Sequence, residues 1–131
     1  SHPSKSSYPL NGADGAVFLQ FDASVLNNTM TLISDTFTAN STPSTARIVL
    51  FGELPDGTSD FTVSATRDNT TFNTITLTDE GYQAGSSGIK IYSGSTPLTG
   101  TASPQVQLRW KIVGSSLTGT NKIHGVSLQW A

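Results

Sequence analysis

The sequence contains no cysteine, and this absence excludes disulfide bonds, thiolate catalysis and zinc sites built from cysteine. Histidine is nearly as scarce. Only His2 and His124 occur, and His2 belongs to a leading Ser-His pair that is typical of a cleaved affinity tag, so a histidine metal cluster is not expected. We therefore expect neither a bound metal ion nor a cofactor.

Charge is also low, because charged residues make up 12% of the chain, about half of the usual share. The seven basic and nine acidic residues give a formal net charge of −2, and no basic stripe could follow a phosphate backbone. No apolar run approaches the length that crosses a membrane. The composition thus argues against a nucleic-acid partner and against membrane insertion.

Serine and threonine are abundant instead, and together they make up more than a quarter of the chain. Threonine suits pleated strands, and apolar stretches with strand spacing recur roughly every ten to fifteen residues between turns. This pattern predicts an all-β fold, an antiparallel β-sandwich or jelly roll, as a single domain over residues 15–131. Residues 1–14 are rich in serine, proline and glycine and are expected to form a flexible N-terminal arm or linker, with residues 1–2 as the tag remnant.

Three segments carry clear strand signals. Residues 105–113 alternate strictly, which predicts that the apolar face with Trp110 lies in the core. Residues 46–54 are apolar on both faces, which predicts a central, doubly buried strand or a strand in an oligomer contact. Residues 121–131 are expected to form the final strand, with a bulge near Gly125 and with Trp130 anchoring the chain end.

No catalytic residue is expected. His124 lies within a predicted strand, and the sequence contains no Gly-x-Ser-x-Gly motif. Asp56, Asp60 and Asp68 lie in predicted turns, where aspartate binds its own backbone, whereas glycoside hydrolysis needs two carboxyl groups across a cleft. We therefore expect a protein that is not an enzyme.

Sugar binding is the function that the composition favours. Aromatic rings stack on the apolar faces of sugar rings, while amides, hydroxyls and carboxylates bind sugar hydroxyls. The binding residues are expected in the loops around Asp56–Asp60, Tyr82–Ser87 and Ser95–Ser103. The candidate ligand-binding residues are Asp56, Asp60, Tyr82, Gln83, Tyr92 and Thr96.

The order of several phrases points to a family. "TMTLISDTFTANSTPSTARIVLFGEL" is followed by "FTVSATRDNTTFNTITLTDEG", "GIKIYSGSTPLTG", "VQLRWKI" and finally "NKIHGVSLQW". Over residues 29–131 this order resembles the C-terminal β-sandwich modules of fibre, tail-associated and head-fibre proteins of tailed bacteriophages. The resemblance implies a homotrimeric tip on the virion surface that contacts other virion proteins and either recognises a bacterial surface or decorates the particle. With the polar composition, we expect the ligand to be a glycan of the host cell. It carries over no binding residues, since such modules share none.

Two other functions remain open at this point. The chain could be a capsid decoration or head-fibre module that stabilises the particle without binding a receptor. It could also be a carbohydrate-binding module of a larger polysaccharide-active protein. Binding to empty capsids without affinity for cells would favour the first, and a catalytic domain elsewhere in the parent protein would favour the second.

Overall fold

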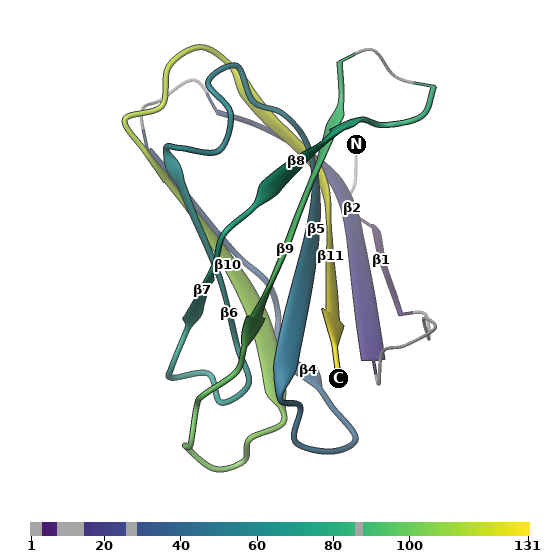
Figure 1. Cartoon of the computed structure of the whole chain (residues 1–131), viewed down its shortest axis with the longest axis vertical. Helices are drawn as coiled ribbons and strands as arrows, with labels where there is room; N and C mark the ends of the chain where they lie inside the picture. Colours follow the sequence, from purple (N-terminus) through teal and green to yellow (C-terminus); the bar gives the residue numbers. More distant parts are fainter. Residues whose placement is uncertain (1–3, 8–14, 26–28, 86–87) are drawn as a thin grey trace.

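The computed structural model describes residues 4–7, 15–25, 29–85 and 88–131. These residues form an all-β fold in which two antiparallel sheets pack together as a single β-sandwich (Figure 1). None of the described segments is a helix long and apolar enough to cross a membrane. The expected fold class is confirmed.

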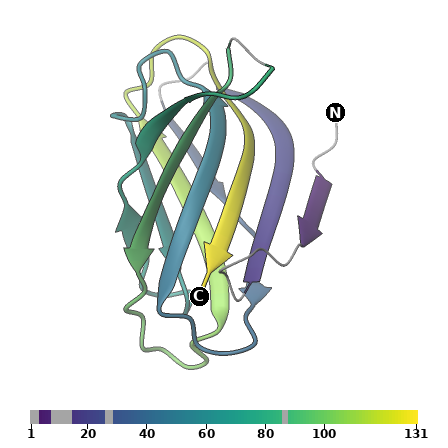
Figure 2. The same cartoon turned by 45° about the vertical axis from the view of Figure 1, so that its right-hand side comes forward.

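The first sheet has six strands in the order β1-β2-β11-β5-β9-β8. Figure 2 shows β1 at the outer edge of this sheet, beside β2. Residues 4–7 of the expected arm thus pair with the sheet, while the rest of residues 1–14 lies outside the described part of the chain. The strands are β1 (Ser4–Ser7), β2 (Gly15–Val25), β5 (Thr45–Glu53), β8 (Thr78–Tyr82), β9 (Lys90–Pro97) and β11 (Asn121–Trp130).

The second sheet has five strands, with β10 paired to both β3 and β6, β6 paired to β7, and the short β4 also paired to β10. The chain then crosses from β7 to the first sheet, where β8 pairs with β9. The strands are β3 (Thr29–Ile33), β4 (Phe37–Thr38), β6 (Phe61–Thr66), β7 (Asn73–Ile75) and β10 (Gln107–Ser115).

The core lies between the two sheets and comes from the alternating faces of their strands. In β10, Leu108 and Ile112 are fully buried and Trp110 is 3% exposed, as its strict alternation predicts. From the opposite sheet, β5 contributes the buried side chains of Ile48 and Leu50. Burying an apolar side chain of this size contributes roughly 1.5–3 kcal/mol, so these strands hold the sheets together.

The C-terminal segment forms β11, a central strand between β2 and β5. Its register shifts between Ile123 and Gly125 against both neighbours, so the expected bulge is confirmed. The glycine is needed there, because a Cβ at Gly125 would lie 2.9 Å from the Phe18 ring. Trp130 is 6% exposed within the core, as expected for a residue that anchors the chain end.

The strand predicted over residues 46–54 is β5, and it does lie inside the sheet, between β11 and β9. Its inward side chains are buried, but Val49 and Phe51 on its outward face are only half-buried. The second apolar face is therefore partly open to solvent in the single chain.

Candidate functional site

Two of the three loops expected to bind a ligand lie at the same end of the sandwich. In Figure 1 the turn after β5 and the described residues that connect β8 and β9 are at the upper end, together with the β10–β11 loop. Ser86 and Ser87 of the expected Tyr82–Ser87 loop lie outside the described residues. The expected Ser95–Ser103 loop is at the lower end, but its first three residues, Ser95 to Pro97, pair with β5 as the end of β9, so the loop itself begins at Leu98. A shared site can therefore include the Asp56–Asp60 turn and the β8–β9 tip, but not the third loop.

A polar groove of about 340 Å³ opens at the upper end. It is bounded by the end of β5 and the residues after it, by the β8–β9 hairpin and by the β10–β11 loop. The residues that line this polar groove are Gly52, Glu53, Leu54, Pro55, Tyr82, Gly88, Lys90, Tyr92 and Thr120.

Tyr82 is the aromatic side chain that the groove presents to solvent. It is 60% exposed, which for such a large residue is unusual in a folded domain. Tyr82 pairs with Lys90 of the neighbouring strand, and Lys90 Nζ lies 5.2 Å from the centre of the tyrosine ring. This cation–π contact steadies the ring without covering the whole side chain.

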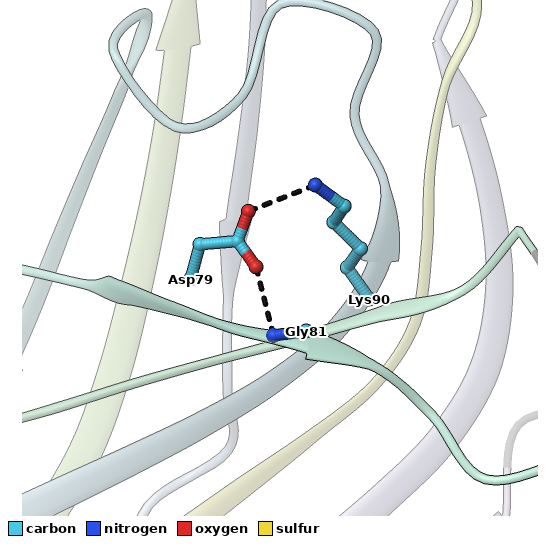
Figure 3. A network of polar contacts seen from close by, with 3 residues as sticks. All are labelled: Asp79, Gly81 and Lys90. Atoms are coloured by element: carbon cyan, nitrogen blue, oxygen red, sulfur yellow. Dashed lines mark hydrogen bonds and ion pairs between the residues drawn. The ribbon is translucent and has the colours of Figure 1, made fainter.

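Asp79 completes a polar network beside Tyr82 (Figure 3). Its Oδ2 accepts a hydrogen bond from Lys90 Nζ at 2.9 Å, and its Oδ1 accepts one from the Gly81 backbone N–H at 2.9 Å. The hydrogen bond from Lys90 lowers the pKa of Asp79, and the same bond raises the pKa of Lys90. Lys90 lines the groove and Asp79 lies directly beside it without lining the groove, so a negative and a positive group are held side by side in their charged forms.

Glu53 brings a second carboxylate to the groove. Its Oε1 lies 2.9 Å from Nε2 of His124, which is the residue inside the β11 bulge. Both side chains are partly exposed. Sequence reasoning placed His124 beside the bulge, but it did not pair it with Glu53, because the contact depends on the register of β11 against β5. Within the described residues, no group of three or more histidine, cysteine or acidic side chains is arranged to hold a metal ion.

The candidate residues of the Asp56–Asp60 turn tie that turn to its neighbours. The Asp56 carboxylate accepts a short hydrogen bond from the Thr118 hydroxyl, which joins the turn to the β10–β11 loop. The backbone carbonyl of Asp60 accepts a hydrogen bond from the N–H of Ser115, at 3.0 Å. Asp56 and Asp60 therefore border the polar groove without lining it.

The other candidates differ in their positions. Gln83 donates its backbone N–H to the carbonyl of Ile89 at 2.7 Å, which closes the β8–β9 hairpin next to Tyr82. Tyr92 lines the groove but is 3% exposed and belongs to the core, and burial raises the pKa of its hydroxyl. Thr96 lies far along β9, opposite Ala46, and is separated from the groove.

The Ser95–Ser103 loop is bound into the opposite end of the sandwich through Asp68. This carboxylate is 4% exposed and accepts hydrogen bonds from the backbone N–H groups of Thr70, Thr71 and Ala102. Burial by itself would raise the pKa of Asp68, but these bonds and one from the Thr66 hydroxyl lower it from 3.8 to about 2. The expected backbone-binding role of Asp68 is confirmed.

The surroundings of Asp68 leave no room for a ligand. A Cβ at Gly100 would lie 2.3 Å from the Asp68 carboxyl carbon, so the loop can approach only with a glycine at this position. Arg67 donates hydrogen bonds to the carbonyls of Gly100 and Pro43, at 2.8 and 2.9 Å. Buried or partly buried polar contacts thereby join the loops that contain Pro43, Asp68 and Gly100.

A second hollow, of about 350 Å³, lies on the outer face of the first sheet, over β2, β5 and β11. The rings of Phe18 and Phe51 meet there edge to face, with their centres 5.9 Å apart. The described residues that line this apolar groove are uncharged: Ala16, Val17, Phe18, Val49, Phe51, Ser127 and Gln129.

Comparison with known proteins adds no family. A scan against protein-family models finds no match to this chain, and a search of curated proteins finds no relative with significant similarity. The function has to be argued from the two grooves and the residues that line them.

Sequence reasoning named Tyr82 for the polar groove but missed Asp79, Lys90 and Glu53. Asp79 reads in the sequence as the end of a strand, and Lys90 lies eleven residues further along the chain. Only the pairing of β8 with β9 brings these two side chains together. Strand alternation places Lys90 and Tyr92 on the same strand face, and this signal could have placed Lys90 near the tyrosines.

Proposed function

We propose that the chain is a non-enzymatic, glycan-binding module at the tip of a bacteriophage fibre, exposed on the virion surface and active as a homotrimer. The observation that carries the glycan-binding part is the exposed Tyr82 beside the charged pair Asp79–Lys90 at the mouth of the polar groove. The assignment to a phage virion follows from the resemblance in the order of sequence phrases over residues 29–131.

The polar groove has the chemistry that sugars require. A pyranose ring presents an apolar face of C–H groups, which can stack on Tyr82, and a rim of hydroxyls, which bind carboxylates and ammonium groups. Tyr82, Lys90 and Asp79 stay in contact with water, so one site is expected to bind weakly. A trimer would multiply that weak binding, because three linked sites act together on a cell surface that displays many copies of a glycan.

The trimer is supported by the apolar groove on the outer face of the first sheet. This groove lies over the inner strands β2, β11 and β5, which have no free edge there, so a partner must cover side chains and cannot add a strand. Phe18, Val49 and Phe51 give that face an uncharged surface suited to the centre of a protein interface. We assign this surface to contact between copies of the chain. Light scattering of the purified protein should then give three times the mass of one chain, and a monomer at micromolar concentration would contradict the assignment.

The glycan-binding function can be tested with the purified 131-residue chain. It should bind members of an array of bacterial surface glycans, and it should block adsorption of a phage that uses the same receptor. The Tyr82→Ala variant should lose both activities, whereas the matched control Thr96→Ala, on the same hairpin but far from the groove, should keep them. Failure of the wild-type chain in both assays would contradict the proposal, and binding to empty capsids without binding to cells would favour a decoration module.

A further inference from the structure

We infer that the polar groove binds an uncharged sugar through two neighbouring hydroxyls, which Asp79 and Lys90 bind while Tyr82 stacks on the sugar ring. This inference rests on the proposed glycan-binding function and names the chemical class of the ligand and the residues that select it.

The first argument is the arrangement of Asp79 and Lys90. Asp79 Oδ2 and Lys90 Nζ are 2.9 Å apart, so an acceptor and a donor lie side by side at the groove (Figure 3). Each hydroxyl of a sugar can donate one hydrogen bond and can also accept hydrogen bonds. One hydroxyl can therefore donate to the carboxylate while its neighbour on the ring accepts from the ammonium group.

The second argument is that this pair is oriented yet retains free capacity. The Gly81 N–H holds the other carboxylate oxygen, Oδ1, at 2.9 Å and so fixes the direction of the Asp79 side chain. The ammonium group of Lys90 has three N–H donors, and its bond to Asp79 uses one of them. The Lys90 side chain is 34% exposed and the Asp79 side chain is 47% exposed, so a ligand can reach both without a change in the fold.

The third argument is the position of Tyr82. It is the pairing partner of Lys90 across β8 and β9, and its ring centre lies 5.2 Å from Lys90 Nζ. Because the ammonium group lies over the ring, the sugar stacks on the part of Tyr82 that Lys90 leaves exposed, with its hydroxyl rim reaching the charged pair at the edge of the ring. Stacking and paired hydroxyl contacts then act on one sugar unit.

The fourth argument concerns charge and decides against an acidic sugar. Among the described residues, this end of the sandwich carries more carboxylates than ammonium groups, and the one ammonium group in the groove is already paired with Asp79. Glu53 lines the groove itself, with Nε2 of His124 2.9 Å from its Oε1. The excess of carboxylates would repel the carboxylate of a uronate or sialate, whereas a neutral sugar would not be repelled. The carboxylates are those of Glu53, Asp56, Asp60, Asp79 and Glu80, and the ammonium groups are those of Lys90 and Lys122.

The test uses the full chain and pairs of glycans that differ in one group. The wild-type protein should bind a neutral hexose oligosaccharide at least tenfold more tightly than the same oligosaccharide with its terminal hexose oxidised to the uronate. It should also prefer the unmodified sugar over analogues in which one of two adjacent hydroxyls is replaced by hydrogen. Equal or tighter binding of the uronate would overturn the inference.

Variants assign the binding to the named residues. Asp79→Asn, Lys90→Met and Tyr82→Ala should each weaken binding at least tenfold, while Tyr82→Phe, which keeps the ring, should stay within about threefold of the wild type. Thr96→Ala serves as the control, and thermal unfolding of each variant shows that the fold is intact. Wild-type affinity in the first three variants would overturn this inference while leaving glycan binding in place. An absence of glycan binding by the wild-type chain would instead overturn both proposals.

Discussion

The two ends of the sandwich use the same kind of side chain in opposite ways. At the lower end Asp68 is 4% exposed, and three backbone N–H groups and one hydroxyl occupy its oxygens. At the upper end Asp79 is exposed and is held by one backbone N–H and by the mobile ammonium group of Lys90. The buried carboxylate joins loops together, whereas the exposed one can exchange part of its bonding with a ligand.

This contrast explains why the loops differ in what they can do. Backbone N–H groups of the Ser95–Ser103 segment form hydrogen bonds within the fold. The N–H of Ala102 binds the Asp68 carboxylate, and the N–H of Leu98 binds the carbonyl of Ser44 at 2.8 Å. In the β8–β9 hairpin the Gln83 N–H binds the carbonyl of Ile89 at 2.7 Å, and the neighbouring Tyr82 is left in solvent. Polar composition alone does not distinguish a structural loop from a binding loop.

The largest effect is expected from removing the strand that runs between the two ends. Deletion of Leu128–Ala131 takes two buried core side chains, Leu128 and Trp130, out of β11, and it also removes the bonds between Ala131 and the start of β5. The product should be unfolded or insoluble, since the loss exceeds what a domain of this size can tolerate. Circular dichroism and solubility after expression measure this, and a soluble product with cooperative unfolding would contradict the role given to β11.

A smaller but still large effect is expected from Asp68→Ala. The change leaves the N–H groups of Thr70, Thr71 and Ala102 without their acceptor in a buried site, and it should lower the free energy of unfolding by about 3 kcal/mol. Urea denaturation measures the loss. The matched variant Asp79→Ala, which removes the exposed carboxylate, should leave the urea midpoint nearly unchanged. Equal losses in both variants would remove the distinction between the two ends.

Acid should weaken the contribution that Asp68 makes to stability at the lower end. The pKa of Asp68 is lowered from 3.8 to about 2 in the folded protein, so between these values the unfolded chain binds a proton that the folded chain does not. The stabilisation from Asp68 is therefore fully present above pH 3.8 and is lost as the pH falls toward 2. As the pH falls from 5 to 2, the free energy of unfolding should decrease more steeply in the wild type than in Asp68→Asn. Parallel plots of this free energy against pH for the two proteins would refute the prediction.

The smallest effect on stability is expected from Tyr82→Ala. Because Tyr82 is 60% exposed, its removal should change the free energy of unfolding by no more than about 0.5 kcal/mol, although it should abolish glycan binding. Urea denaturation and the glycan array, applied to the same preparation, compare the two quantities. A large loss of stability would mean that Tyr82 supports the β8–β9 hairpin and is not simply presented by it.

Several elements could be predicted because their signals are local. Strict alternation predicted the buried face of β10 with Trp110. In the last strand, Ile123 is out of phase with the residues that follow, and together with Gly125 this predicted the bulge. The grouping of loops could not be predicted in this way. Tyr92 reads as a loop-proximal aromatic, but pairing of β9 with β5 places it opposite Leu50 in the core.

Composition and alternation were sufficient for the fold class and for the core strands, because both depend on the period of side chains along one strand. The tertiary structure alone decided which aspartate is buried among loop backbone groups and which stays exposed beside the polar groove. That decision depends on contacts between distant segments: Lys90 reaches Asp79 only through the β8–β9 register, and Ala102 reaches Asp68 across 34 positions of sequence. Aspartate has the same chemistry at both sites, and burial determines whether its oxygens are available to a ligand.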